Sequence, residues 1–479
     1  MQKETSLKPL RALVAAVHLP SVTDNEFESS LTELRELAKT LGFVVVGTFI
    51  QKRAKFDASA YLGVGKRQEM RQFVEHGEVG DEQPDEEAED DEPTEADPET
   101  RHADVVLVDH DISPSQARHL EIAVGCEVMD RTMVILEIFH RHATSKAARA
   151  QVEIARLRYM SPRLREAAKL AGPQGRQRSG TGGRGAGETQ LAMDRQKIRN
   201  RIAELEEEIL AMDVERKTQR ARRQANQAAQ AGSQLARVAL VGYTNAGKST
   251  LMRALTGSEV LVANKLFATL DTTVRALHPE TVPRVLVSDT VGFIKNLPHD
   301  LVASFKSTLE EASESSLLLH VIDASDPGFE RQLEVTEKVL EEVGAGEVPR
   351  IKVFNKIDMV GDAKAQAERE AALRKQYPDC VVMSAKREAD VAKMHATISG
   401  FFRKDMVEAE LFLPWSMQQL RGKIFAGCEV LDERADEDGA YLRVRGDAEL
   451  LKGLQEQLGQ KPVEVTEKPR GKAGARKAR

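Results

Sequence analysis

The sequence predicts an α/β protein with more than one mostly parallel sheet, and three observations support this fold class. From Leu10 to about Asp130, short Val-rich runs alternate with amphipathic helical segments, which is the pattern of βα units on a parallel sheet. A second stretch, RVALVG at 237–242, leads directly into a glycine-rich loop and then a helical run. The length of 479 residues allows about three domains of roughly 150 residues each.

We expect five parts along the chain. They are an N-terminal α/β domain (1–142), a long antiparallel helical hairpin (143–234), a domain with a doubly wound, mostly parallel sheet (235–405), a small α+β domain (406–466) and a basic disordered tail (467–479). An acidic insertion at 79–102 interrupts the first part. It is expected to be disordered, because it combines charge and proline with an absence of large apolar residues.

The hairpin is predicted from apolar spacing and from glycine. Ile198, Ile202, Leu205, Ile209 and Met212 recur at alternating spacings of four and three, as in the seam of a coiled coil. The loop GPQGRQRSGTGGRGAG at 172–187 cannot form regular structure at low entropic cost. Two helices joined by a flexible basic tip are therefore expected, and the second is expected to fray into a linker over QRARRQANQAAQAGS at 219–233.

Composition favours a cytoplasmic protein. Cys126, Cys380 and Cys428 show no metal-ligand spacing, which is typical of a reducing compartment. The segment MQKETSLKPL has no apolar signal core, and no run reaches the roughly 18 apolar residues of a membrane span. We expect a monomer without a membrane span.

Four short strings follow one another in the order that guanine nucleotide recognition requires. They are GYTNAGKST (242–250), DTVGF (289–293), NKID (355–358) and SAK (384–386). In the first, Gly242 and Gly247 let backbone N–H groups surround phosphates, Lys248 supplies charge to the β- and γ-phosphates, and Ser249 places its hydroxyl on Mg²⁺. Glycine flexibility and a surface lysine would explain this string alone, but not all four together.

The other strings complete the predicted site. Asp289 ends a strand, where its carboxylate can hold Mg²⁺ through water, and Gly292 can offer its N–H to the γ-phosphate. Asp358 can accept two hydrogen bonds from the guanine edge, and the Ala385 N–H can donate to the guanine oxygen. Asn355 is expected to support the loop and reach the base, and the Lys356 stem to cover the ring. The predicted nucleotide-binding residues are Gly242, Tyr243, Thr244, Asn245, Ala246, Gly247, Lys248, Ser249, Thr250, Asp289, Thr290, Val291, Gly292, Asn355, Lys356, Asp358, Ser384, Ala385 and Lys386.

The segment LFATLDTTVR at 266–275 has the composition of a switch that closes on Mg²⁺ and the γ-phosphate. Thr269 is the first choice for that contact, with Thr272 and Thr273 as alternatives. The predicted catalytic residues are therefore Lys248, Thr269 and Gly292, and the predicted Mg²⁺ ligands are Ser249, Thr269 and Asp289.

Phe293 predicts slow hydrolysis by the protein alone. Many GTPases carry a glutamine after this glycine to orient the attacking water, and a phenylalanine can neither donate nor accept a hydrogen bond. A partner, another switch residue or a monovalent cation must supply what is missing. Asn245 is a candidate K⁺ ligand, although a structural loop asparagine explains it equally well.

Longer strings resemble the HflX family of ribosome-associated GTPases. The resemblance covers nearly the whole chain and includes VVGTFIQKR, VVLVDHDISPSQARHLE, GGRGAGETQLAMDR, VALVGYTNAGKSTL and DTVGFIKNLPHDLVASFKSTLEE. It implies a protein that binds the large ribosomal subunit in its GTP state, directs the hairpin toward ribosomal RNA and helps to split or rescue stalled ribosomes, with GTP hydrolysis accompanying release. Candidate RNA contacts are Arg176, Arg178 and Arg184 at the tip, and Lys146, Arg149, Arg156 and Arg158 on the hairpin. The acidic insertion departs from the family pattern.

Three other interpretations stay open. The switch could act on a protein or membrane effector, the chain could use GTP only as a ligand, or YLGVGK at 61–66 could mark a second nucleotide site for ATP. The last string lacks the spacing of a phosphate-binding loop, so a tight turn explains it better.

Overall fold

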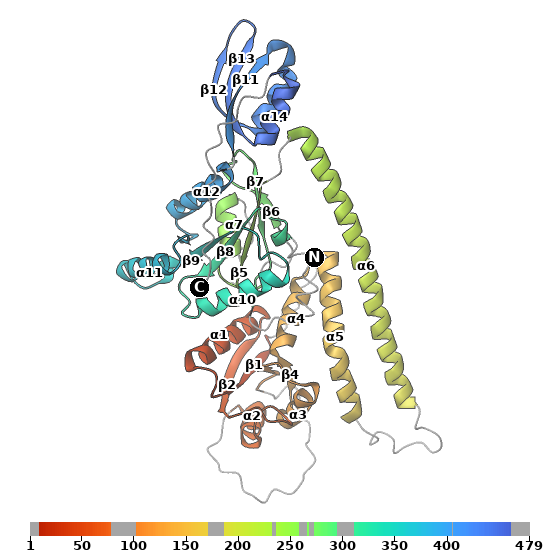
Figure 1. Ribbon diagram of the computed structural model, residues 1–479. Helices are drawn as coiled ribbons and strands as arrows, with labels where there is room; N and C mark the ends of the chain where they lie inside the picture. The colour runs from red at the N-terminus through yellow and green to blue at the C-terminus, as the bar shows by residue number, and fades with distance from the viewer. Residues whose placement is uncertain are drawn as a thin grey trace, which may run out of the picture.

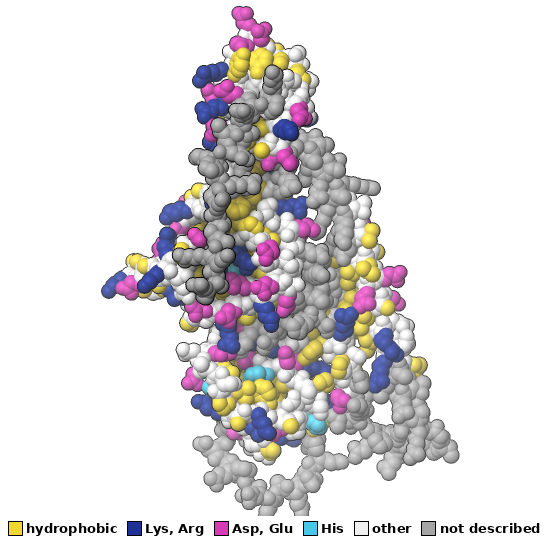
Figure 2. Space-filling model, viewed as in Figure 1, with side chains coloured by type: hydrophobic (Ala, Val, Ile, Leu, Met, Phe, Trp, Pro, Cys, Tyr) yellow, Lys and Arg dark blue, Asp and Glu magenta, His cyan; other side chains and the backbone are white. Residues whose placement is uncertain are grey.

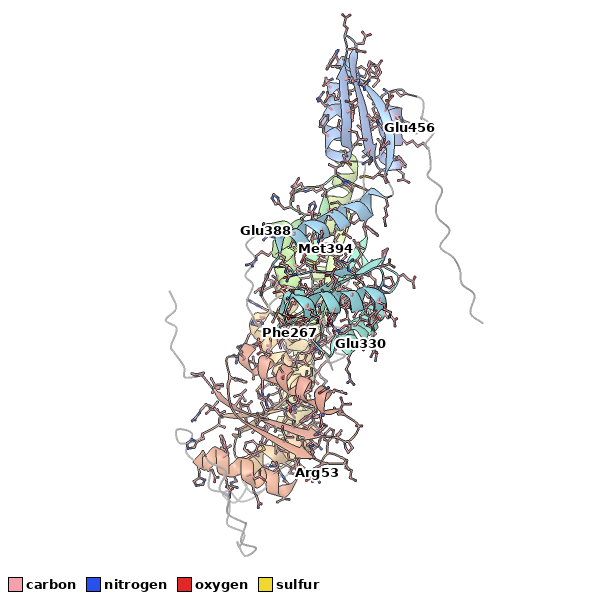
Figure 3. All side chains as sticks on the ribbon, turned by 90° about the vertical axis from the view of Figure 1, so that its left-hand side faces the viewer. Arg53, Phe267, Glu330, Glu388, Met394 and Glu456 are labelled. Carbon is pink, nitrogen blue, oxygen red and sulfur yellow. The ribbon has the colours of Figure 1, made fainter. Side chains whose placement is uncertain are left out.

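The computed structural model describes residues 9–77, 102–170, 186–231, 236–257, 266–267, 273–294, 311–404 and 406–460. Three sheets follow one another along an elongated molecule, and a long helical hairpin runs beside them (Figure 1). A view from the side shows the same sequence of layers (Figure 3). The predicted mixed α/β fold is confirmed.

The N-terminal sheet is parallel, with strand order β2-β1-β3-β4. Its strands are β1 (Arg11–His18), β2 (Val44–Lys52), β3 (Val105–Val108) and β4 (Glu127–Asp130). Its helices are α1 (Asp24–Thr40), α2 (Val64–His76), α3 (Pro114–Val124) and α4 (Arg131–His142). Apolar residues of α1 and α4 pack on one face of the sheet, and those of α2 and α3 pack on the other.

The hairpin consists of α5 (Lys146–Leu170) and α6 (Ala186–Ala231), which run antiparallel (Figure 1). Leu205 is buried against Ala150 and Ile154, and Ile202 and Ile209 pack beside them, which confirms the predicted seam. The expected fraying from residue 219 is wrong, since α6 continues to Ala231. Alanine, glutamine and arginine all favour helix, and residues 219–231 contain no glycine or proline.

The middle sheet has the order β10-β9-β8-β5-β7-β6, and every pairing is parallel except that of β6 with β7. Its strands are β5 (Ala236–Gly242), β6 (Thr273–Ala276), β7 (Val285–Asp289), β8 (Leu317–Asp323), β9 (Arg350–Asn355) and β10 (Val381–Val382). Its helices are α7 (Lys248–Thr256), α10 (Phe329–Glu342), the short η2 (Ile357–Met359), α11 (Ala363–Gln376) and α12 (Glu388–Arg403).

The C-terminal sheet is antiparallel, with order β11-β13-β12. It contains β11 (Val407–Pro414), β12 (Glu429–Ala435) and β13 (Gly439–Gly446). The short η3 (Trp415–Leu420) with α13 (Arg421–Gly427) and α14 (Ala448–Gln457) pack on it through a separate apolar core. This matches the α+β unit expected from the sequence.

Helix α4 connects the N-terminal and middle parts. Eight of its twelve residues are buried, because one side faces the N-terminal sheet and another faces residues 266–267. The Phe139 and Phe267 rings lie 4.6 Å apart, and the Leu266 N–H donates to Thr40 Oγ1 at 3.1 Å. Figure 3 shows Phe267 at the level where the two parts meet. The segment that precedes the predicted switch threonines is therefore held by the N-terminal part.

Candidate nucleotide-binding site

The loop between β5 and α7 has a backbone that only glycine can adopt at two positions. Gly242 has φ 149° and Gly247 has φ 94°. A Cβ atom at Gly242 would lie 2.1 Å from the Val321 carbonyl oxygen, and one at Gly247 would lie 2.3 Å from Asn355 Nδ2. Helix α7 begins directly after Gly247, so the loop directs N–H groups and a helix N-terminus toward the same space. That arrangement suits a phosphate.

Lys248 lies buried at the start of α7. Its Nζ donates to the carbonyl oxygens of Gly242 at 3.0 Å and Tyr243 at 2.8 Å. Burial lowers the pKa of Lys248 to about 8, although Asp289 acts in the opposite direction. The loop thus holds the ammonium group where an incoming phosphate could replace the two carbonyls.

The fold brings Ser249 and Asp289, two of the predicted Mg²⁺ ligands, into contact. Ser249 Oγ donates to Asp289 Oδ2 at 2.7 Å, and Thr273 of β6 is paired with Asp289 across the sheet. A hydroxyl and a carboxylate are the hard oxygen donors that Mg²⁺ prefers, so these residues fit that ion. Thr269, the third predicted ligand, and Thr272 lie outside the described residues.

Asn355 joins the phosphate loop to the predicted base-binding loop. Its Nδ2 donates to the Ala246 carbonyl at 3.0 Å, and its Oδ1 accepts from the Ala385 N–H at 2.9 Å. The expected support of the loop by Asn355 is present. The Ala385 N–H, which was expected to face the guanine oxygen, donates in this structure to Asn355.

The remaining base-site residues lie around this bridge. Lys356 has φ 62° and its Nζ pairs with Asp323 at 2.8 Å. The Asp358 carboxylate lies 3.9 Å from the Lys386 ammonium, and the backbone N–H of Lys386 donates to Ser384 Oγ at 3.2 Å. The fold therefore brings NKID and SAK to the edge of the sheet that carries the phosphate loop.

The second motif pairs with the phosphate loop through its backbone. The Phe293 N–H donates to the Gly242 carbonyl at 3.1 Å, and the Thr244 N–H donates to the Phe293 carbonyl at 2.7 Å. Thr290 Oγ1 also donates to the Leu240 carbonyl at 2.7 Å. A Cβ atom at Gly292 would lie 2.9 Å from Thr244 Cγ2 and 3.0 Å from Lys248 Nζ. Gly292 is thus the residue that lets the two loops approach.

Phe293 has a structural role that the sequence did not indicate. Its side chain is 2% exposed and belongs, with Val291 and Ile294, to the apolar cluster shared with α1 and α4. It therefore serves packing between the two parts of the chain, which explains why an apolar residue occupies this position.

Sequence reasoning also missed Glu33 and Arg131. Tyr243 OH donates to Glu33 Oε1 at 2.8 Å, and Glu33 pairs with Arg131 at the start of α4. Arg131 pairs in addition with Asp109 at 2.9 Å. One signal was available: Arg131 precedes the mostly apolar run TMVILEIF, and a buried arginine needs acidic partners.

The predicted RNA contacts divide into two groups. Arg176, Arg178 and Arg184 lie outside the described residues. On the hairpin, Lys146 is exposed. Arg149 is also exposed and donates to the Ala143 carbonyl at 3.0 Å, Arg156 lies 3.5 Å from Glu137 and Arg158 lies 2.6 Å from Glu206. Of these contacts, that of Arg158 joins the two helices of the hairpin, and that of Arg156 joins α5 to α4.

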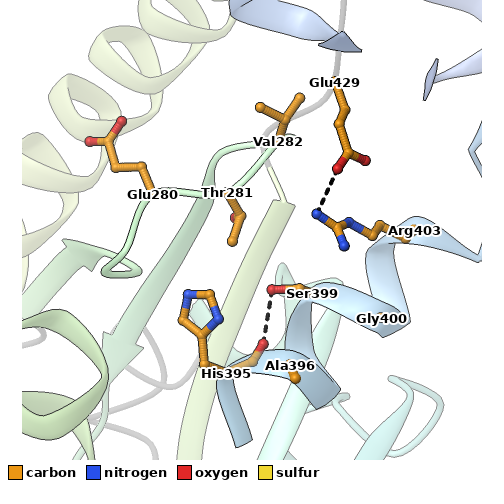
Figure 4. A pocket seen from close by; sticks show the side chains of 9 residues that line it. All are labelled: Glu280, Thr281, Val282, His395, Ala396, Ser399, Gly400, Arg403 and Glu429. Carbon is orange, nitrogen blue, oxygen red and sulfur yellow. Dashed lines mark hydrogen bonds and ion pairs between the residues drawn. The ribbon is translucent and has the colours of Figure 1, made fainter. Parts of the chain in front are cut away.

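A cavity of about 450 Å³ lies elsewhere, between α12, the β6–β7 connection and Glu429 of the C-terminal sheet (Figure 4). Arg403 crosses it to pair with Glu429 at 3.0 Å, and His395 Nε2 lies 2.9 Å from the Pro279 carbonyl. The β6–β7 connection is at the opposite end of β7 from Asp289. This cavity is therefore separate from the nucleotide loop.

The fold and the site define the class of a P-loop GTPase, because a buried strand, a glycine-rich loop with its lysine and a helix are followed in order by the magnesium and guanine motifs. Three family models match the chain. They are described as a 50S ribosome-binding GTPase (residues 237–356), a GTP-binding GTPase middle region (142–223) and a GTP-binding GTPase N-terminal region (28–81 and 92–140).

Named relatives extend this match along the chain. GTPase HflX of Gluconacetobacter diazotrophicus is 51% identical over 91% of this chain and 95% of its own length. GTPase HflX of Escherichia coli is 35% identical over 90% of this chain and 92% of its own length. A solved GTP-binding protein from Sulfolobus solfataricus in complex with GDP is 22% identical, with a TM-score of 0.41, over 81% of this chain and 100% of its own. The chain belongs to the HflX family of GTPases, and it is a GTP-binding protein that hydrolyses GTP. No helix among the described residues is long and apolar enough to cross a membrane.

Proposed function

We propose that this GTPase binds the large ribosomal subunit in its GTP state through the α5–α6 hairpin, and that it splits or rescues stalled ribosomes, with hydrolysis driving release. One observation carries the proposal. The hairpin runs beside the three sheets (Figure 1), and its two helices are joined in the sequence by the Gly- and Arg-rich segment 171–185. The family model that matches residues 237–356 is described as ribosome-binding, which supports the same partner.

Charge on α6 supports a nucleic-acid partner. Arg195, Lys197 and Arg199 are exposed on the part of α6 that lies near the segment 171–185. Figure 2 shows dark blue Lys and Arg side chains on this part of the hairpin. Together with Arg176, Arg178 and Arg184 they would give contacts to RNA phosphates, which release counterions and weaken as salt rises.

At the nucleotide, we propose that Lys248 and the loop N–H groups bind the phosphates, that Ser249, Asp289 and Thr269 hold Mg²⁺, and that Asp358 reads guanine. Bound Mg²⁺ would neutralise charge on the β- and γ-phosphates. The Gly292 N–H would donate to the γ-phosphate, so the second motif would respond when that phosphate is lost. Asn355 keeps the phosphate loop and the SAK loop in one arrangement.

Hydrolysis needs a water-orienting group that Phe293 does not supply, since its side chain is buried away from solvent. We propose that the ribosome completes the site, with the exposed Asn245 as a candidate K⁺ ligand.

Charge removal in the hairpin loop tests this function. Changing Arg176, Arg178 and Arg184 together to Gln should weaken binding to purified large subunits, measured by co-sedimentation, at least tenfold. The change should also reduce the salt dependence of that binding. The matched control changes Lys364, Arg374 and Lys375 to Gln, since these are exposed on α11 of the middle part. An equal loss of binding in the two triple variants would contradict a hairpin contact. Binding that does not change with salt concentration would favour an apolar protein effector.

A further inference from the structure

A chain of buried polar contacts runs from the hairpin to the phosphate loop. Its centre is the pair Asp130 and Arg131, which are neighbours at the junction of β4 and α4. Asp130 is fully buried and Arg131 is 1% exposed. Each of the two faces a different part of the molecule, so the junction touches both the hairpin and the middle part.

On the hairpin side, Asp130 binds two residues of α5. Arg163 pairs with Asp130 at 2.5 Å, and Tyr159 OH donates to the same carboxylate. The Arg163 guanidinium also lies over the Tyr159 ring, 4.9 Å from its centroid. The half of α5 nearer the segment 171–185 is thus anchored at Asp130, which in addition caps α4 by accepting from the Met133 N–H at 3.0 Å.

On the nucleotide side, Arg131 reaches the phosphate loop through one intermediate. Its guanidinium pairs with Asp109 and with Glu33 of α1, and the second oxygen of Glu33 accepts from Tyr243 OH at 2.8 Å. Tyr243 is the second residue of the phosphate loop, and its carbonyl oxygen accepts from Lys248 Nζ. Glu33 therefore fixes the loop residue that holds the phosphate-binding lysine.

We propose that Glu33 is a positioning residue for the phosphate loop, and that the contacts Arg163–Asp130 and Arg131–Glu33–Tyr243 transmit the position of the hairpin to the bound nucleotide. The hairpin half of this proposal rests on the proposed function, which makes the hairpin the part that meets the partner. The part that concerns Glu33 and the phosphate loop can be tested on the full-length protein without a ribosome.

The test measures release of a fluorescent GDP analogue from the full-length protein without ribosomes. Tyr243→Phe keeps the ring and removes the hydroxyl, and Glu33→Gln keeps an acceptor oxygen and removes the charge that orders Arg131. Each should speed release about tenfold, which is the lower range for loss of a hydrogen bond to a charged group. The double variant should match the single ones, because both changes break one path.

Two further variants separate positioning from general stability. Arg331→Met breaks the pair between Arg331 of α10 and Glu26, which joins the same helix α1 to the middle part without reaching the phosphate loop. It should leave release unchanged at a similar thermal midpoint. Arg163→Met should speed GDP release several-fold in the wild-type background. In a protein that already carries Tyr243→Phe, it should have no further effect on release. If Arg163→Met does not fold, Arg163→Lys replaces it and should show the same background dependence.

Three results would overturn the proposal. The first is a release rate within twofold of wild type in both Tyr243→Phe and Glu33→Gln, and the second is a double variant whose fold-change in release is the product of the two single fold-changes. The third is an equal effect of Arg163→Met on release in both backgrounds. Failure of the full-length protein to bind large subunits would refute the proposed function while leaving the Tyr243 and Glu33 comparison valid. The two failures are therefore distinguishable.

Discussion

Replacing Asn355 with alanine should separate the phosphate loop from the base-binding loop. The side chain is 2% exposed and makes two hydrogen bonds, to the Ala246 carbonyl and from the Ala385 N–H. Each is worth about 1 kcal/mol net, and a buried group left without a partner costs about 1–3 kcal/mol. Two groups lose their partner, so the change should cost about 2–6 kcal/mol, and at 1.4 kcal/mol per factor of ten its lower limit corresponds to roughly 30-fold weaker GDP binding.

Equilibrium titration with a fluorescent GDP analogue measures this loss. Asn355→Asp keeps an oxygen for the Ala385 N–H but places a carboxylate against the Ala246 carbonyl, so it should bind GDP at least as weakly as Asn355→Ala. Asn200→Ala, on the exposed surface of α6, serves as the control and should bind like wild type. GDP affinity within threefold of wild type in folded Asn355→Ala would refute the bridging role.

Three further predictions concern the same part of the chain. Gly292→Ala should lower GTP turnover at least tenfold in a steady-state phosphate-release assay, because the added methyl would lie 2.9 Å from Thr244 Cγ2 and 3.0 Å from Lys248 Nζ; turnover equal to wild type would show that the loops need not approach so closely. Burial, helped by the charges of Lys352 and Arg350, lowers the pKa of His320 from its ordinary 6.5 to about 3. Below pH 6.5 the unfolded chain therefore binds a proton that the folded chain does not, and the free energy of unfolding falls as the pH falls. Between pH 6.5 and 4.5 this loss is about 2 kcal/mol, and chemical unfolding of His320→Leu should lack it; identical pH profiles would contradict this assignment. If Asn245 binds K⁺, exchanging Na⁺ for K⁺ should raise the GTPase rate of wild type but not of Asn245→Ala, whereas equal rates in both salts would leave Asn245 as a structural loop residue.

Much of the fold and of the site was accessible from sequence because the relevant signals are local. Gly242 and Gly247 are required by backbone angles and close approach within one loop, and alternating apolar runs report strands and helices through their own burial. The same reasoning found the apolar seam of the hairpin around Leu205.

The long-range polar contacts were not accessible in this way. Tyr243 and Glu33 are 210 residues apart, and Asn355 and Ala246 are 109 apart, so no local pattern indicates that they meet. Phe293 was interpreted through the hydrogen bond that it cannot make, whereas its position follows from an apolar interface with α1 and α4. The expected fraying of α6 from residue 219 gave too little weight to the helix propensity of alanine, glutamine and arginine, which continue the helix to Ala231.

We propose that the nucleotide state decides whether this GTPase occupies the large ribosomal subunit. The most direct measurement is co-sedimentation of the full-length protein with purified large subunits, in the presence of a non-hydrolysable GTP analogue or of GDP. The account predicts that the protein sediments with the subunit in the analogue and stays largely in the supernatant in GDP. Equal sedimentation in the two nucleotides would contradict it.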